Sequence, residues 1–285
     1  MTRKISCFFP VALLALMASH SHAAILFNEI YANPVGTDDN REFIELISTT
    51  GGAEPMTGLV LLLIDANGGS SGGIDEAFNL NNYSTGTNGL LAIGNDYDVA
   101  TPGPLAGPWN AQWMDPAKGN QQTVLKDPSG AAPFTGLGTG DLSNNAFVAL
   151  LVSGFTGAAG QDLDTNDDGI FETTPWGSIV DSIAWNEGTG TALAGRIYGM
   201  PSLSNTAFTP DSVSRLPGNV TPNSAAAWFG GDLATDLTYD PVQNFALPPG
   251  AVPTPTYANI VVPEPSTLIL GTMGCLALIA IRRKR

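Results

Sequence analysis

Short apolar or alternating stretches, separated by Gly, Asn, Asp and Pro, recur along the middle of the chain. They cover residues 25–31, 42–47, 59–64, 90–93, 146–152 and 178–184. The stretch at 59–64 is apolar at every position, which is typical of a strand buried on both faces. None of the intervening sequence has a sustained 3.6-residue period with helix caps. The pattern therefore predicts an all-β fold of many short strands joined by turns.

Residues 95–141 show little strand pattern and contain six prolines. We expect them to form a loop-rich insertion, with Trp109 and Trp113 as packing anchors, inside a single domain that spans residues 24–246. Residues 247–262 hold four further prolines and predict an extended linker after that domain.

The first 23 residues have the pattern of a secretory signal peptide. Arg3 and Lys4 precede an apolar stretch, and Ser21 and Ala23 are the small residues that a signal peptidase recognises. We expect a signal helix over residues 1–23, removed by signal peptidase, so that the folded part of the protein lies outside the cytoplasm.

An uncharged apolar run of 14 residues, 268–281, lies between a Pro-Glu-Pro triplet and a terminal basic cluster. The run is shorter than the ~20 residues that comfortably span a bilayer, but a basic cluster after it is typical of the cytoplasmic end of a membrane anchor. In order, spacing and position, residues 263–285 resemble the PEP-CTERM sorting signal of Gram-negative bacteria. The residues that carry the resemblance are Pro263, Glu264, Pro265, Arg282 and Arg283.

This resemblance implies a single transmembrane helix that anchors the protein in the inner membrane before an exosortase recognises and cuts the tail. It also implies association with extracellular polysaccharide, at the cell surface or in the surrounding matrix. An ordinary single-pass anchor is the alternative, and the two hypotheses predict different mature C-termini.

Charge narrows the possible partners. The chain has 26 acidic and 11 basic residues, for a formal charge of −15. Residues 24–263 hold 25 of the acidic residues and five of the basic ones, so this part carries about −20. Such a surface repels phosphate backbones, which argues against nucleic-acid binding and favours divalent cations or neutral sugars as partners.

The distribution of histidine and cysteine excludes several kinds of catalysis. His20, His22 and Cys7 lie in the predicted signal peptide, and Cys275 lies in the predicted tail. Residues 24–263 therefore have no Ser-His-Asp triad, no Cys-His pair, no His-ligated zinc and no disulfide. We expect the domain not to be an enzyme.

A second resemblance concerns the first two predicted strands. Asn28 and Glu29, the turn at Asn33 and Pro34, and the Glu-Phe-Ile-Glu-Leu stretch at 42–46 resemble the start of a lamin-tail domain. Later matches are Val180, Asp181, Ile183, Ser212, Arg215 and Trp228. The resemblance implies an immunoglobulin-like β-sandwich with long loops, in a family of mostly non-catalytic modules.

The strongest local motif for chemistry lies between two predicted strands. Counted from Asp164, oxygen-bearing side chains fall at the first, third and fifth positions, and Gly169 stands sixth, where the loop must turn sharply. The candidate Ca²⁺ ligands are Asp162, Asp164, Asn166, Asp168, Glu172 and, through its carbonyl, Ile170. Position 12 is Pro175 and not the bidentate Glu of an EF-hand, so Asp162 or a distant carboxylate such as Asp181 would have to complete the shell. A solvated turn without an ion is the alternative.

The sequence thus predicts a secreted, exosortase-processed surface protein. Its domain would be a non-catalytic structural or binding module in the cell envelope or polysaccharide matrix, stabilised by Ca²⁺. The competing hypothesis is a carboxylate-based hydrolase that acts on extracellular polysaccharide. Glu29, Glu42 and Glu45 are the candidate carboxylates, because two carboxylates suffice for that reaction without histidine.

Overall fold

The structure is a computed structural model. It describes residues 25–33, 42–67, 71–94, 123–124, 142, 146–185, 196–203, 210–234, 238–248 and 251. The predicted signal peptide, most of the predicted insertion, both of its tryptophans, and the predicted sorting signal with its transmembrane helix lie outside this part. Within the described residues, no helix has the length and apolar character needed to cross a membrane.

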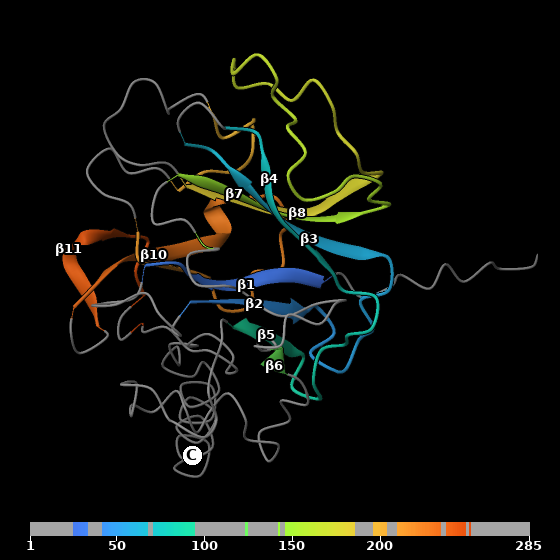
Figure 1. Cartoon of the computed structure of the whole chain (residues 1–285). Helices are drawn as coiled ribbons and strands as arrows, with labels where there is room; N and C mark the ends of the chain where they lie inside the picture. The colour runs from blue at the N-terminus through green and yellow to red at the C-terminus, as the bar shows by residue number, and fades with distance from the viewer. Residues whose placement is uncertain are drawn as a thin grey trace, which may run out of the picture.

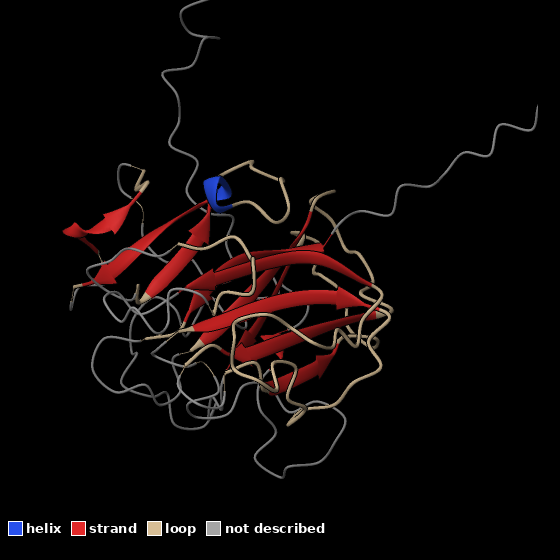
Figure 2. Cartoon of the chain, turned by 90° about the horizontal axis from the view of Figure 1, so that it is seen from above, coloured by secondary structure: helices blue, strands red, loops and turns tan. Residues whose placement is uncertain are grey.

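The described residues are almost entirely strand and loop, as Figure 2 shows. One 3-10 turn, η3 (Ala225–Ala227), is the helical element named among them. The strands are β1 (Ile25–Tyr31), β2 (Phe43–Ser48), β3 (Leu59–Asp65), β4 (Ile74–Asn79), β5 (Leu90–Gly94), β6 (Thr123–Val124), β7 (Phe147–Ser153), β8 (Ser178–Trp185), β9 (Ser212–Arg215), β10 (Trp228–Leu233) and β11 (Tyr239–Phe245). The all-β prediction is confirmed.

The strands form two sheets. The larger has the order β11-β10-β9-β1-β2-β5-β6 and the smaller β4-β3-β7-β8. Neighbours are antiparallel throughout, except that β6, which lies in the predicted insertion, pairs parallel with β5. In Figure 1 the smaller sheet lies above β1, β2 and β5 of the larger one.

A shared hydrophobic core joins the sheets. Ile30 and Ile44 of the larger sheet belong to the same buried cluster as Leu61 and Leu151 of the smaller sheet. Because successive side chains of a strand point to opposite faces of the sheet, β3 and β7 also have apolar side chains on the face opposite this core. Val60, Leu62 and Ile64 enter a second buried cluster on the outer face of the smaller sheet. The prediction that residues 59–64 are buried on both faces is therefore confirmed.

A third buried cluster covers the other face of the larger sheet. It contains Tyr31, Phe43, Phe229, Leu233, Tyr239 and Ala251. Tyr31 and Phe43 pack at 5.8 Å between ring centroids, and Phe229 meets Tyr239 edge-on at 6.1 Å. Leu247 packs against the same cluster, so Leu247 and Ala251, two residues of the expected linker, lie against the sheet.

A buried ion pair crosses from one sheet to the other. Asp181 of β8 accepts a hydrogen bond from Arg215 of β9, and both side chains are almost wholly excluded from solvent. Asp181 also accepts from the backbone N–H groups of Phe27, at 2.9 Å, and Asn223, at 2.8 Å. Arg215 donates through Nε to the Phe27 carbonyl, and its guanidinium lies 4.7 Å from the centre of the Trp228 ring.

The two partners offset only part of the electrostatic cost of burial, since the pKa of Asp181 stays raised and that of Arg215 stays lowered. Burial raises the pKa of Asp181, whereas the positive charge of Arg215 and the backbone N–H donors lower it. Burial lowers the pKa of Arg215, and Asp181 raises it. The charges are therefore stabilised in the interior only as a pair, and they tie β8 to β1 and β9.

Candidate metal-binding loop

The predicted Ca²⁺ loop lies between β7 and β8, and its first residues are anchored to the start of β4. Asp162 forms an isolated antiparallel bridge with Gly73. Leu163 donates its N–H to the Gly72 carbonyl at 3.0 Å and buries its side chain in the cluster on the outer face of the smaller sheet. The loop closes where the Glu172 N–H reaches back to the Leu163 carbonyl at 2.8 Å.

Asp164 is the centre of the loop and is 1% exposed. Its Oδ1 accepts from the Asp168 N–H at 3.0 Å, and its Oδ2 accepts from the Gly169 N–H at 2.9 Å and from the Tyr198 hydroxyl at 3.0 Å. Gly169 has φ 86°, a left-handed conformation that glycine adopts without steric cost. The sharp turn predicted at this glycine is therefore present.

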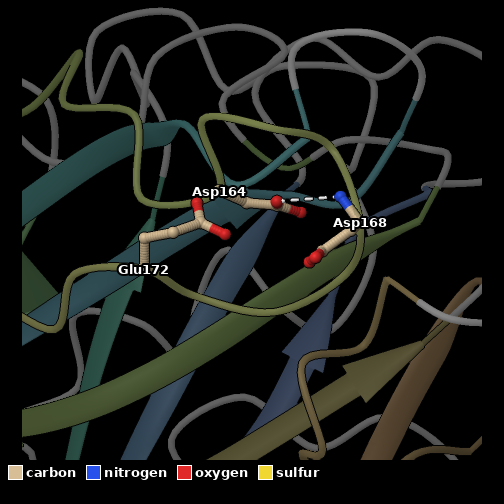
Figure 3. Close-up of side chains that lie close together, drawn as sticks. All are labelled: Asp164, Asp168 and Glu172. Carbon is tan, nitrogen blue, oxygen red and sulfur yellow. Dashed lines mark hydrogen bonds between the residues drawn. The ribbon is translucent and has the colours of Figure 1, made fainter.

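Three of the predicted ligands converge. Carboxylate oxygens of Asp164, Asp168 and Glu172 lie within 4.8 Å of one another, with Asp164 buried and the other two exposed. Figure 3 shows Asp164 between Glu172 and Asp168, inside the loop. Glu172 is held by the Thr165 N–H at 2.7 Å, and Asp168 accepts from the Ile170 N–H at 3.0 Å.

The other three predicted Ca²⁺ ligands lie outside this carboxylate cluster. Asp162 accepts from the Asp164 N–H at 3.0 Å, and Asn166 accepts from the Asp168 N–H at 3.0 Å, so each side chain stabilises a local turn. Ile170 is 66% exposed. Asp181 does not join the cluster, because it is engaged by Arg215 between the two sheets.

The loop is supported by residues that the sequence motif did not include. Phe171 stacks on Tyr198 with ring centroids 4.0 Å apart, and Trp176 meets Phe171 edge-on at 5.8 Å. Burial raises the pKa of Tyr198, and its bond to Asp164 also acts to raise it, so the hydroxyl stays a donor. Tyr198 is 34 residues from Asp164 along the chain, and no spacing rule links them.

The donor set fits a hard cation. Three carboxylates that converge on one side of a tight loop supply the all-oxygen ligands that Ca²⁺ prefers, and carbonyl or water oxygens can complete six to eight positions. The same bonds from N–H groups to Asp164 and Asp168 also fit the alternative of a turn without an ion. The geometry is compatible with both hypotheses.

The candidate hydrolase residues lie on the larger sheet. Glu29 of β1 and Glu45 of β2 are directly opposite each other in the register, and Asn28 donates its side-chain N–H to Glu45 at 2.5 Å. Glu42, one residue before β2, is buried like the other two. Burial raises the pKa of Tyr239, and the charge of Glu29 raises it further. All three glutamates are fully excluded from solvent.

Comparison with known proteins identifies the C-terminal end of the chain. Residues 261–285 match the PEP-CTERM protein-sorting motif. The match confirms the sorting signal expected from the sequence and includes all five residues that suggested it. No curated protein and no solved structure matches the chain. The motif is that of an exported Gram-negative protein with a membrane-associated C-terminal signal that an exosortase processes.

Proposed function

We propose that this protein is exported, processed at its tail by an exosortase, and retained at the cell surface or in the polysaccharide matrix as a non-catalytic structural or binding module. The observation that carries the proposal is the sorting motif at residues 261–285. The charge of about −20 on residues 24–263 supports a role beside neutral sugars and cations.

For the domain itself we propose an immunoglobulin-like, lamin-tail-like β-sandwich. Two facing sheets support this architecture. Three of the residues that suggested the family are linked through Arg215, which binds Asp181 and lies over the Trp228 ring. Asp181 and Arg215 also bind the backbone of β1 at Phe27. Such domains serve many roles, so the architecture by itself selects no ligand.

The proposal that the domain is not an enzyme has two supports. Residues 24–263 contain neither His nor Cys. The carboxylates of Glu29 and Glu45 are fully buried, so a polysaccharide approaching from solvent does not reach them. A hydrolase would need this face of the sheet to open. The purified protein should therefore release no reducing sugar from a panel of polysaccharides, and release that is lost in a folded Glu45→Gln variant would establish the hydrolase instead.

We further propose that Asp164, Asp168 and Glu172 hold Ca²⁺. Calorimetric melting of the protein with and without Ca²⁺ tests this step. For an affinity in the ~10⁻⁴ to 10⁻³ M range, a tenfold excess over the dissociation constant stabilises the fold by about 1.4 kcal/mol. Asp168→Asn should abolish most of this gain while still accepting the Ile170 N–H. Asp162→Asn, which changes the same loop outside the cluster, should keep it. No shift in the wild-type melting temperature would reject the ion.

The surface role is tested by cell fractionation. The complete protein should accompany the surface and polysaccharide fractions, and a variant that ends at residue 260 should not be retained there. Binding of the purified protein to cell-free polysaccharide, measured with and without Ca²⁺, separates a polysaccharide-binding module from a structural one. Equal distribution of both forms among the fractions would contradict the role assigned to the tail.

A further inference from the structure

Three carboxylates interact at the β10–β11 hairpin, at the edge of the larger sheet: Asp232 and Asp240 belong to the hairpin, and Asp211 directly precedes β9. Asp232 of β10 accepts a hydrogen bond from the Gln243 side chain of β11 at 2.6 Å. The Gln243 backbone N–H is bound by Asp240, also of β11, at 3.0 Å. Asp240 and Asp232 are therefore linked through a single glutamine on the edge strand.

Asp211 flanks Asp232 from the other side. Its N–H donates to the Gly231 carbonyl at 3.1 Å, and its Oδ2 accepts from the Leu233 N–H at 2.8 Å. Asp211 thus binds both chain neighbours of Asp232. The connection between β10 and β11 contains one more acid, Asp236, which lies outside the described residues.

The negative charge of ionised Asp232 is poorly stabilised by its surroundings. Its Oδ2 accepts from Gln243, but its Oδ1 is buried and receives no hydrogen bond from the described residues. The charges of the described residues that act on Asp232 are those of Asp211 and Asp240, and both are negative. A buried carboxylate oxygen without a donor, close to two like charges, favours the protonated form.

The titration of Asp232 agrees with this geometry. Burial raises its pKa from 3.8 to about 6, and the charges of Asp211 and Asp240 contribute to the rise. An acid whose pKa is higher in the folded state than in the unfolded state contributes stability while it is protonated. That contribution is lost as the pH rises from about 4 through about 6.

We propose that the β10–β11 hairpin is an acid-stabilised element: protonation of Asp232 strengthens the attachment of β11 to the sheet, and ionisation weakens it. Among the described residues, β11 is the last strand before the chain continues towards the sorting motif. At mildly acidic pH, β11 is therefore bound more stably to the sheet, and at neutral pH it is bound less stably. This inference does not depend on the proposed function.

Hydrogen exchange of the complete purified chain at pH 5 and pH 7.5, corrected for intrinsic exchange rates, tests the proposal. Peptides from β11 should lose protection by about threefold to tenfold at the higher pH, where the lower figure allows for solvent screening of a half-exposed group. Peptides from β7, in the centre of the smaller sheet, should show no such change.

Three variants decide the outcome. Asp232→Asn should give β11 the same protection at both pH values, because the amide is neutral throughout. Asp240→Asn still accepts hydrogen bonds and should move the midpoint of the wild-type change to lower pH. Asp75→Asn, an exposed residue of β4, should behave as the wild type. Equal β11 protection of the wild type at both pH values, or a pH response retained by Asp232→Asn, would overturn the proposal.

Discussion

The buried ion pair of Asp181 and Arg215 holds the two sheets together, so removing one of its charges should destabilise the fold strongly. Asp181→Asn keeps the shape of the side chain but removes its charge and one of its acceptor oxygens. Oδ2 of the carboxylate receives both the Phe27 N–H and the Arg215 guanidinium. An amide NH₂ at that position would face these donors, and Arg215, at 2% exposure, would remain charged in the interior. Breaking one side of such a pair costs about 3–5 kcal/mol.

Urea unfolding followed by tryptophan fluorescence measures this loss, since Trp228 is buried beside Arg215. Asp75→Asn, which changes the same charge on an exposed residue of β4, should alter the free energy of unfolding by less than about 0.5 kcal/mol. A loss below about 1 kcal/mol for Asp181→Asn, with an unchanged urea dependence, would refute the argument that the pair joins the sheets.

Replacing the other partner, Arg215, tests how the charge of Asp181 contributes to stability. Arg215→Met leaves Asp181 without the positive charge that lowers its pKa, so burial raises that pKa further. Because the folded-state pKa then lies well above the unfolded one, the variant should lose stability progressively as the pH rises above about 4. The cost of Arg215→Met should therefore be smaller at pH 5 than at pH 8. A cost independent of pH would show that Asp181 is not buried as an anion in the variant.

Three further substitutions test other parts of the molecule. Gly72→Ala should cost roughly 2–4 kcal/mol in urea unfolding, because Gly72 has φ +90° and an added Cβ would lie 2.5 Å from the Asp164 Cβ; an unchanged midpoint would contradict the close approach. Tyr198→Phe removes the hydroxyl donor of buried Asp164 and should cost about 1–3 kcal/mol in thermal unfolding, whereas a neutral effect would mean that Asp164 finds another donor. Leu62→Ala, in β3, one of the two inner strands of the smaller sheet, should cost about 2–5 kcal/mol by chemical denaturation, and a loss under 1 kcal/mol would argue against its burial.

Strands that are apolar on one or both faces could be predicted from the sequence. β1 agrees residue for residue with the predicted stretch, β3 is one residue longer at its end, and β7 is shifted by one residue at both ends. Both β3 and β7 are buried on two faces, so their apolar runs are long and unambiguous. β4 was not predicted because it lies at an edge and carries Asp75 and Glu76, which obscure the alternation. β10 was not predicted because Gly230 and Gly231 interrupt its pattern.

Only the local part of the candidate loop could be predicted from the sequence. The turn at Gly169 and the carboxylates of Asp164, Asp168 and Glu172 follow from local spacing, which the sequence displays directly. The contacts of Asp164 with Tyr198 and of Asp181 with Arg215 join segments 34 residues apart. Only tertiary packing decides such partners. The assignment of Asp181 to an ion pair, and not to the metal shell, could therefore come only from the structure.

The central claim is that the tail at residues 261–285 is a sorting signal that an exosortase cuts. Mass spectrometry of the protein recovered from cells with and without the exosortase tests it most directly. If the tail is a sorting signal, it should stay intact and end at Arg285 in cells without the enzyme, and the mature C-terminus should lie upstream of the basic cluster in cells that have it. A tail ending at Arg285 in both strains would contradict the claim and leave an ordinary membrane anchor.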